Sequence, residues 1–309
     1  MSTALVGYTG FVGSNIYANG HFDAAYNSKN ITKAFGTKPD LLIFAGLRAE
    51  KYLANTAPEK DMKTIITAER EIEKISPKKL VLISTIDVFK NPNGKNESSE
   101  VDIDGLSAYG LNRYRLEQWV REQYSDALIL RLPGLFGTHI KKNFIYDFLN
   151  IVPFMLNKDK YEELSEKAPE IRNAYQLLDN GFYQLTVSDQ TEKKKLKNIF
   201  RTLGFTALNF TDSRASYQFY HLSRLYRDIE TALQAGLTLW HPATEPVSAG
   251  ELYHFLTGSD FVNEISDFPA HYDYRTEYAS IFGGSGQYIE SKESVLNEIK
   301  EFVKEQENA

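Results

Sequence analysis

A threonine, a tyrosine and an arginine have the types and spacing of a proton-transfer site. Tyr109 and Arg113 are four residues apart, a spacing that places two side chains on one face of a helix. A permanent cation beside a phenol favours the phenolate and lowers its pKa from about 10. Tyr109 would then exchange a proton with a carbonyl or hydroxyl near neutral pH. A surface Tyr–Arg pair is the alternative interpretation.

Two further polar side chains follow an apolar run of strand length that begins at Leu80. Thr85 ends this run, and Asp87 lies two residues further on and can point to the same side. In parallel α/β sheets, ligands sit beyond the carboxyl ends of the strands. We therefore expect Thr85 to project its hydroxyl into a ligand crevice.

Three glycines near the N-terminus have the spacing of a phosphate-binding turn. Gly7, Gly10 and Gly13 follow a short apolar run from Thr3 and open a helix-like segment that reaches Tyr17. The first glycine permits the tight turn, the second lets the backbone approach a pyrophosphate, and the third lets the helix pack closely on the strand. The N-terminus of the helix adds free N–H groups and the positive end of its dipole. We therefore expect a dinucleotide to bind here.

The segment after the second expected strand bears on which dinucleotide binds. An acidic residue there would bind the ribose 2′-hydroxyl of NAD, and Asn27-Ser28-Lys29-Asn30 contains none. Ser28 and Lys29 suit a 2′-phosphate instead, so the sequence favours NADP over NAD. An exposed lysine beside a loosely bound ribose is the alternative.

These residues are positioned by strands that alternate with helices. Continuous apolar runs, typical of strands buried on both faces, cover residues 3–7, 22–26, 40–45, 80–85 and 128–132. Amphipathic helix-like runs separate most of them, but the link between the second and third strands is too short for a full crossover helix. The pattern predicts an α/β fold with a doubly wound parallel sheet of the Rossmann type.

The composition changes after residue 140. Residues 157–205 carry many charges and predict a helical insertion with a turn at 179–181, and an amphipathic helix is expected at 291–305. We expect a smaller, discontinuous α-rich substrate-binding domain beside the dinucleotide-binding domain. The expected ranges are 1–140 plus 217–244 for the dinucleotide-binding domain, and 141–216 plus 245–309 for the substrate-binding domain.

Composition excludes several classes of protein. The 309 residues include no cysteine and carry a net charge of −6, which excludes thiolate chemistry and argues against binding nucleic acid. No stretch is apolar for long enough to cross a bilayer, and the N-terminus lacks the basic flank of a signal peptide. None of the histidines has metal-ligand spacing. We therefore expect a cytoplasmic protein that binds no metal.

Taken together, the motifs resemble the extended short-chain dehydrogenase/reductases, which include the NAD-dependent epimerase/dehydratase family. Members are NAD(P)-dependent epimerases, dehydratases and reductases of nucleotide sugars. The resemblance covers the first 140 residues well and the rest loosely, and it is nearest the dTDP-4-dehydrorhamnose reductase branch. It rests on Gly-x-x-Gly-x-x-Gly from Gly7, Ser-Thr-x-x-Val-Phe from Ser84, Tyr-x-x-x-basic from Tyr109, and Arg131-Leu-Pro-Gly-Leu-Phe-Gly137.

The resemblance implies a role for each residue of the motifs. Thr85 would hydrogen-bond the reacting oxygen, Tyr109 would be the acid/base and Arg113 would bias Tyr109 towards the phenolate, while hydride passes between the substrate and nicotinamide C4. Polar contacts with the substrate are expected from Asp87, Arg131, Asn143, Arg214 and Arg224. Cofactor contacts are expected from Gly7, Gly10, Phe11, Val12, Gly13, Ala45, Gly46 and Pro133.

Two departures from the family pattern leave other functions open. Arg113 stands where the family has a lysine that also binds the nicotinamide ribose, and arginine is a planar fork instead of a compact ammonium. Tyr217 stands where the family often has an arginine that clamps the nucleotide diphosphate, and Arg214 or Arg224 is the candidate to replace it.

The sequence favours an oxidoreductase or epimerase that acts on a sugar, nucleotide-linked by the resemblance. A non-catalytic dinucleotide-binding sensor or scaffold is the first alternative, and Arg113 is its main support. A dehydratase that uses Asp87 as an acid or base is the second, although a turn or helix cap is the simpler role for Asp87. Because relatives pair through the tyrosine helix, the resemblance also implies a homodimer.

Overall fold

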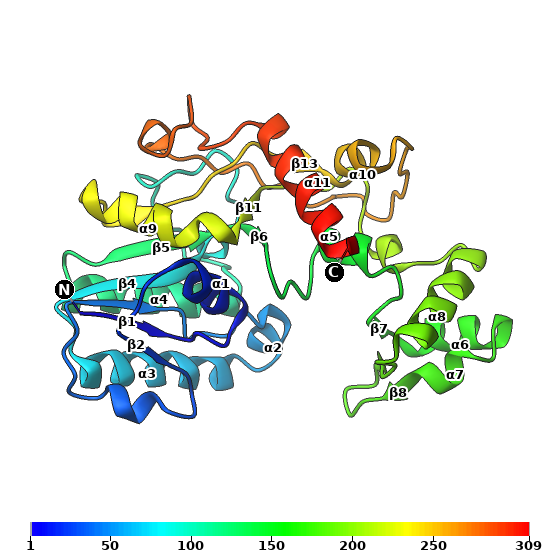
Figure 1. Cartoon of the computed structure of the whole chain (residues 1–309), viewed down its shortest axis with the longest axis horizontal. Coiled ribbons are helices and arrows are strands. Elements are labelled where there is room, and N and C mark those ends of the chain that lie inside the picture. The colour runs from blue at the N-terminus through cyan, green and yellow to red at the C-terminus, as the bar shows by residue number, and fades with distance from the viewer. Residues whose placement is uncertain (1, 309) are drawn as a thin grey trace. The chain divides into compact units, whose positions relative to one another are not determined.

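The computed structural model describes residues 2–308, which form two compact units. The first unit comprises Met1–Ile140, Ser216–Val247 and His271–Glu298; the second comprises Lys141–Ala215, Ser248–Ala270 and Ile299–Ala309. Figure 1 labels their helices and strands. Among the described residues, no helix has both the length and the hydropathy needed to span a membrane.

A six-stranded sheet forms the centre of the first unit. Its strand order is β12-β5-β4-β3-β1-β2, and every neighbouring pair is parallel. The carboxyl ends of all six strands therefore lie along one edge, which confirms the predicted doubly wound α/β fold. The strands are β1 (Thr3–Val6), β2 (Ala24–Tyr26), β3 (Leu41–Phe44), β4 (Lys79–Thr85), β5 (Leu128–Leu132) and β12 (Leu239–Trp240).

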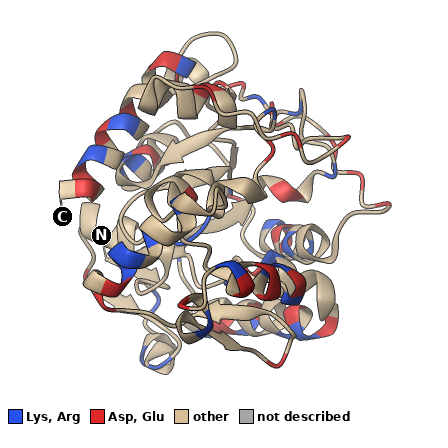
Figure 2. Cartoon of the chain, turned by 90° about the vertical axis from the view of Figure 1, so that its right-hand side faces the viewer, with Lys and Arg blue, Asp and Glu red and all other residues tan. Residues whose placement is uncertain are grey.

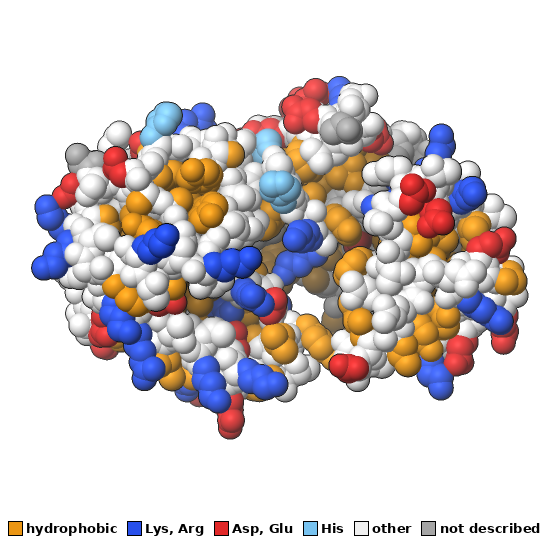
Figure 3. All heavy atoms as spheres, turned by 60° about the horizontal axis from the view of Figure 1, so that its bottom comes forward, with side chains coloured by type: hydrophobic (Ala, Val, Ile, Leu, Met, Phe, Trp, Pro, Cys, Tyr) orange, Lys and Arg blue, Asp and Glu red, His pale blue; other side chains and the backbone are white. Residues whose placement is uncertain are grey.

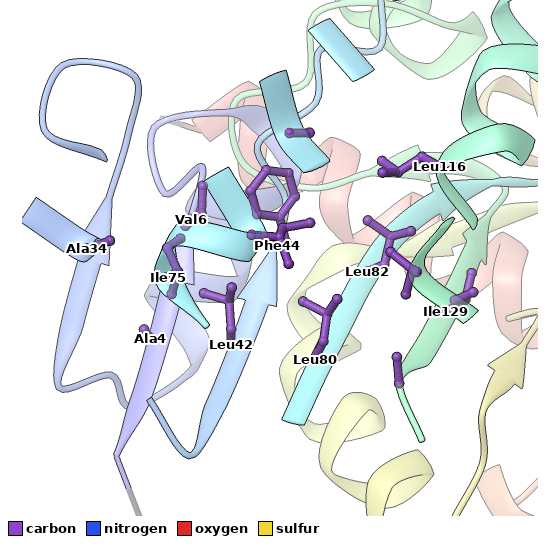
Figure 4. Close-up of a cluster of buried hydrophobic side chains, with 14 of the residues drawn as sticks. Ala4, Val6, Ala34, Leu42, Phe44, Ile75, Leu80, Leu82, Leu116 and Ile129 are labelled. Carbon is purple, nitrogen blue, oxygen red and sulfur yellow. The ribbon is translucent and has the colours of Figure 1, made fainter. Parts of the chain in front are cut away.

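Helices cover both faces of the sheet because successive strand residues point to opposite sides. Ala4 and Val6 pack in a cluster with α3 (Pro58–Ile75) and α4 (Ala108–Gln123), as Figure 4 shows in part. Leu5 lies in a second cluster with α1 (Phe11–Asn19) and α9 (Leu225–Gln234). Only a short 3₁₀ turn, η1 (Ile31–Ala34), joins β2 to β3, which confirms the missing crossover helix.

Residues 271–298 belong to the first unit, although the sequence placed them with the substrate-binding domain. The cause is Tyr274, which is fully buried and exchanges two hydrogen bonds with Gln218. It packs with Ile86, Val88 and Phe89, directly after β4. A hydropathy pattern does not reveal such a contact between distant segments, so the boundary at residue 245 was wrong for this stretch.

The second unit contains a small antiparallel sheet that the predicted helical insertion omitted. Its order is β7-β9-β8, and the expected turn at residues 179–181 joins β8 to β9, with Gly181 at φ +82°. Strands of two or three residues are too short to show a period in the sequence. The elements are α5 (Phe144–Leu149), β7 (Met155–Leu156), α6 (Lys158–Lys167), α7 (Ile171–Ala174), β8 (Tyr175–Leu177), β9 (Tyr183–Leu185), α8 (Gln190–Thr202) and α10 (Ala249–Thr257).

The last helix, α11 (Lys292–Asn308), is amphipathic as predicted. Val295, Ile299 and Phe302 are buried, while basic and acidic residues share the rest of the helix, which ends at the C mark in Figure 2. On the face drawn in Figure 3, Lys and Arg side chains lie among hydrophobic and uncharged ones. Such a mixed surface is normal for a folded chain.

A buried ion pair joins α4 to the centre of the sheet. The Arg131 guanidinium on β5 donates to both carboxylate oxygens of Glu117 on α4, at 2.7–3.2 Å. The Ser84 hydroxyl on β4 donates to the same carboxylate at 2.5 Å. Arg131 is only 2% exposed, so the expected substrate contact at Arg131 was wrong: this side chain instead fixes α4 against β4 and β5.

Loss of the Glu117 carboxylate leaves the Arg131 charge buried without a partner. We expect Glu117→Ala to lower the free energy of unfolding in urea by about 3–5 kcal/mol. The double variant Glu117→Leu/Arg131→Met removes both charges, so its free energy of unfolding should fall much less. A single variant as stable as the wild type would show that the pair does not hold α4.

Candidate active site

The glycine turn joins β1 to α1 through unusually close backbone contacts. Gly7 has φ +96°, and a Cβ there would lie 2.3 Å from the Ala45 carbonyl oxygen. A Cβ on Gly13 would lie 2.1 Å from the Gly7 carbonyl oxygen. Only glycine fits at both positions, because any side chain would overlap the backbone.

The start of α1 suits an anionic group. Gly10 is the N-cap residue, no side chain caps the helix, and its first turn contains no acidic residue. The first backbone N–H groups of a helix have no acceptor within it, so Phe11, Val12 and Gly13 can direct theirs at a phosphate. The residues at this turn therefore fit the pyrophosphate of a dinucleotide.

Two neighbouring loops meet the turn. Asn27, Ser28 and Lys29 follow β2, whose Tyr26 carbonyl accepts the Gly7 N–H at 2.7 Å; both Ser28 and Lys29 are exposed. Ala45 and Gly46 follow β3, and the Ala45 N–H donates to the Val6 carbonyl at 2.9 Å. Pro133 lies directly after β5, at the same edge of the sheet.

Thr85, Tyr109 and Arg113 meet where β4 ends. Thr85 ends β4 and Tyr109 lies in the first turn of α4, close enough for the Thr85 hydroxyl to lower the pKa of the phenol. The Arg113 guanidinium carbon lies 4.1 Å from the centre of the Tyr109 ring. Both residues on α4 are buried, at 7% exposure for Tyr109 and 4% for Arg113. The structure thus brings together the three residues for which the sequence predicted proton transfer.

Arg113 is held from behind by α3 and by the loop after β3. Its guanidinium donates to the Asp61 carboxylate and, at 2.9 Å, to the Arg48 carbonyl. Asp61 also accepts from Asn112 at 2.9 Å. Because a buried carboxylate compensates its charge, Arg113 is a fixed cation on the face of the Tyr109 ring.

The electrostatic effect on Tyr109 differs from the predicted one. Burial raises the pKa of Tyr109 above its ordinary value of 10.0, and this outweighs Arg113, which acts in the opposite direction. The sequence revealed the cation but not the depth of burial, so the net shift of the pKa is opposite to the expected one. A raised pKa favours the protonated phenol.

Sequence reasoning missed Lys51 and Tyr272, which surround Asp87. Lys51 begins the short helix α2 (Lys51–Thr56), and its ammonium donates to Asp87 at 2.9 Å. The Tyr272 hydroxyl donates to the same oxygen at 3.4 Å. The carboxylate is therefore an ion-pair partner, and the cap of η2 (Ile86–Val88) is Thr85 instead. The position of Lys51 just beyond the end of β3 was the available signal.

The other residues expected to contact the substrate form ion pairs or hydrogen bonds within the protein. Arg224 forms ion pairs with Asp228, Glu290 and Glu298 within the first unit. Arg214 holds Asp212, Glu264 and the Ser266 carbonyl within the second. The Asn143 side chain caps α5. These contacts give all three residues structural roles that the sequence did not predict.

The fold and this constellation define a Rossmann-type protein of the extended short-chain dehydrogenase/reductase class. Residues 4–158 match the family described as RmlD substrate binding domain, and the chain belongs to that family. Among curated proteins, no sequence matches this chain.

Solved structures with the same fold span almost the whole chain. The dTDP-4-dehydrorhamnose reductase of Yersinia enterocolitica superposes with a TM-score of 0.63 at 12% identity, covering 98% of this chain and 99% of that one. That of Bacillus anthracis str. Ames, in complex with NADP, has a TM-score of 0.60 at 15% identity and covers 96% of each chain. The UDP-N-acetylglucosamine 4-epimerase of Methanobrevibacter ruminantium M1 has a TM-score of 0.62 at 14% identity, covering 98% of this chain and 97% of that one. At these identities the likeness is one of fold.

The glycine turn allows a matched comparison of two positive-φ glycines. Gly36 has φ +74° with no atom within 4 Å of a built Cβ. Gly36→Ala should therefore cost only the backbone strain, about 1–2 kcal/mol of unfolding free energy. Gly7→Ala adds the overlap with Ala45 and should cost clearly more in the same urea titration. Equal losses would mean that the close approach at Gly7 is not needed.

Proposed function

We propose that the chain is an NADP-dependent oxidoreductase that reduces a carbonyl of a nucleotide-linked sugar. The observation that carries this proposal is the buried Tyr109 at the carboxyl end of β4, beside Thr85 and with the Arg113 guanidinium carbon 4.1 Å from the centre of its ring. β4 is separated from β1, the strand of the glycine turn, by β3 alone. The family and the reductases of the same fold support it.

The glycine turn would hold the coenzyme. Gly7, Gly10 and Gly13 would receive the pyrophosphate, and Lys29 with Ser28 would receive the 2′-phosphate. Ala45 and Gly46, whose backbone lies against the turn, would contact the ribose, and Pro133, which follows β5 at the same sheet edge, would contact the carboxamide. When bound, NADPH supplies the hydride.

The raised pKa of Tyr109 favours the reductive direction. Reduction of a carbonyl needs a proton on the oxygen as hydride reaches the carbon, and a protonated phenol is the group that can donate it. Thr85, which ends β4 beside the same phenol, would orient that oxygen. Arg113 would stabilise the phenolate that remains after the transfer, because its charge lies on the ring face.

Removal of the phenolic hydroxyl should stop the reaction and spare the coenzyme. We expect Tyr109→Phe to lower kcat by about 10²–10⁴-fold, the usual contribution of a general acid. Coenzyme affinity, measured by NADPH fluorescence, should stay unchanged because the ring remains. A variant that keeps full turnover of nucleotide sugars would eliminate Tyr109 as the proton donor.

Coenzyme selection should depend on the loop after β2. We expect Lys29→Ala to weaken NADPH binding at least tenfold and to leave NADH binding nearly unchanged, because only NADPH carries the 2′-phosphate. Lys33→Ala, at an exposed lysine in η1, is the matched control. Equal weakening of both coenzymes by Lys29→Ala would contradict selection by this residue.

A non-catalytic dinucleotide-binding sensor remains the second candidate, because Arg113 is engaged by Asp61 and not free to meet a ligand. Such a sensor would bind NADPH but would not oxidise it in the presence of any nucleotide sugar. The proposed homodimer through α4, which the class implies, is a separate question. Analytical ultracentrifugation of the intact chain decides it.

A further inference from the structure

Asp87 packs against the start of α4. Its backbone carbonyl lies directly against Gly110, the residue after Tyr109, and its N–H donates to the Thr85 hydroxyl oxygen at 3.2 Å. A negative charge beside a phenol opposes formation of the phenolate. An uncompensated Asp87 would therefore hinder any reaction in which Tyr109 gives up its proton.

Arg113 does not compensate Asp87. Its guanidinium is directed at Asp61 and at the Arg48 carbonyl, and it is almost completely buried. The cation that contacts Asp87 is Lys51, at 2.9 Å. Unlike Arg113, the Lys51 side chain is half exposed, at 47%.

Lys51 and Tyr272 meet at the same carboxylate oxygen. The Tyr272 hydroxyl donates at 3.4 Å to the Asp87 oxygen that also accepts from the Lys51 ammonium. Lys51 comes from α2, Asp87 from η2 and Tyr272 from the segment that follows residue 270, and all three lie in the first unit.

We propose that Lys51 is a charge-tuning residue of this site, whose ammonium neutralises Asp87 beside Tyr109 and thereby permits the phenolate to form. The proposal rests on the proposed function for its catalytic consequence, but the electrostatic coupling exists without turnover. The charged and titratable groups that act on Tyr109 are Arg113 from α4, Asp87 from η2 and Lys51 from α2. Lys51 and Arg113 lower its pKa, and Asp87 raises it.

The test is a double-mutant cycle read at position 109 itself. A fluorinated tyrosine, which ionises nearer neutral pH, is installed at residue 109 of the full chain and titrated by ¹⁹F NMR. We expect Lys51→Met to move the titration midpoint to higher pH and Asp87→Asn to move it to lower pH. In the double variant the midpoint should return close to that of the parent, because the pair is removed together.

Two further variants keep the test decisive. Lys51→Arg should retain most of the parent midpoint, and Lys60→Met, at an exposed lysine on α3, should leave it unchanged. A Lys51→Met midpoint equal to the parent's, or a double variant shifted as far as Lys51→Met, would overturn the proposal. If Lys51→Met fails to fold by circular dichroism, Lys51→Gln takes its place in the cycle.

Activity separates this inference from the proposed function. If nucleotide sugars are reduced, the alkaline limb of the kcat profile should follow the ¹⁹F midpoint to higher pH in Lys51→Met, with KM for NADPH unchanged. If none is reduced while the midpoint still moves, the proposed function fails and the charge coupling stands. If nucleotide sugars are reduced but the ¹⁹F midpoint does not move in Lys51→Met, the proposed function stands and the charge coupling fails.

Discussion

Compensation of buried charge on one face of α4 is the constraint on which the site depends. Tyr109, Arg113 and Glu117 follow one another at intervals of four residues, so all three face the interior. Arg113 and Glu117 are charged and almost without solvent, and each meets an opposite charge: Asp61 on α3 and Arg131 on β5. A buried charge without a partner costs several kcal/mol, so α4 can settle only in the register that satisfies both pairs. That register also places Tyr109 against Thr85.

The parts of this arrangement that the sequence predicts are those with a local signal. The runs from Leu80 to Thr85 and from Leu128 to Leu132 are mostly apolar because both faces of the sheet are covered, and such runs indicate strands. The roles of Gly7 and Gly13 could also be predicted, because their spacing matches a turn in which backbone contacts backbone. Tyr109 and Arg113 share a helix face by geometry alone.

Charge pairing between distant segments has no such signal, and most of the errors arose there. Arg131 and Arg224 were expected to contact the substrate, but Arg131 pairs with Glu117 on another element and Arg224 pairs with Glu290, far along the chain, as well as with the nearby Asp228. Asp87 and Lys51 are 36 residues apart, and Tyr272 lies 185 residues beyond Asp87. The strands β8 and β9 were not predicted for a different reason: three residues are too few to show the alternation of apolar and polar side chains that indicates a strand.

Two opposing effects set the pKa of Tyr109, and only one of them can be inferred from the sequence. A cation on the ring lowers the pKa of a phenol and burial raises it, and only the cation can be inferred from spacing. The packing of α4 against the sheet decides the balance in favour of the protonated form. In the proposed reaction, a site built this way would hold its proton until a reacting oxygen acquires negative charge beside the phenol. Arg113 and Lys51 would then stabilise the charge left on Tyr109, and Asp87 would oppose it. Burial would thus keep the phenol protonated before the transfer, and neutralisation of Asp87 would ease the transfer.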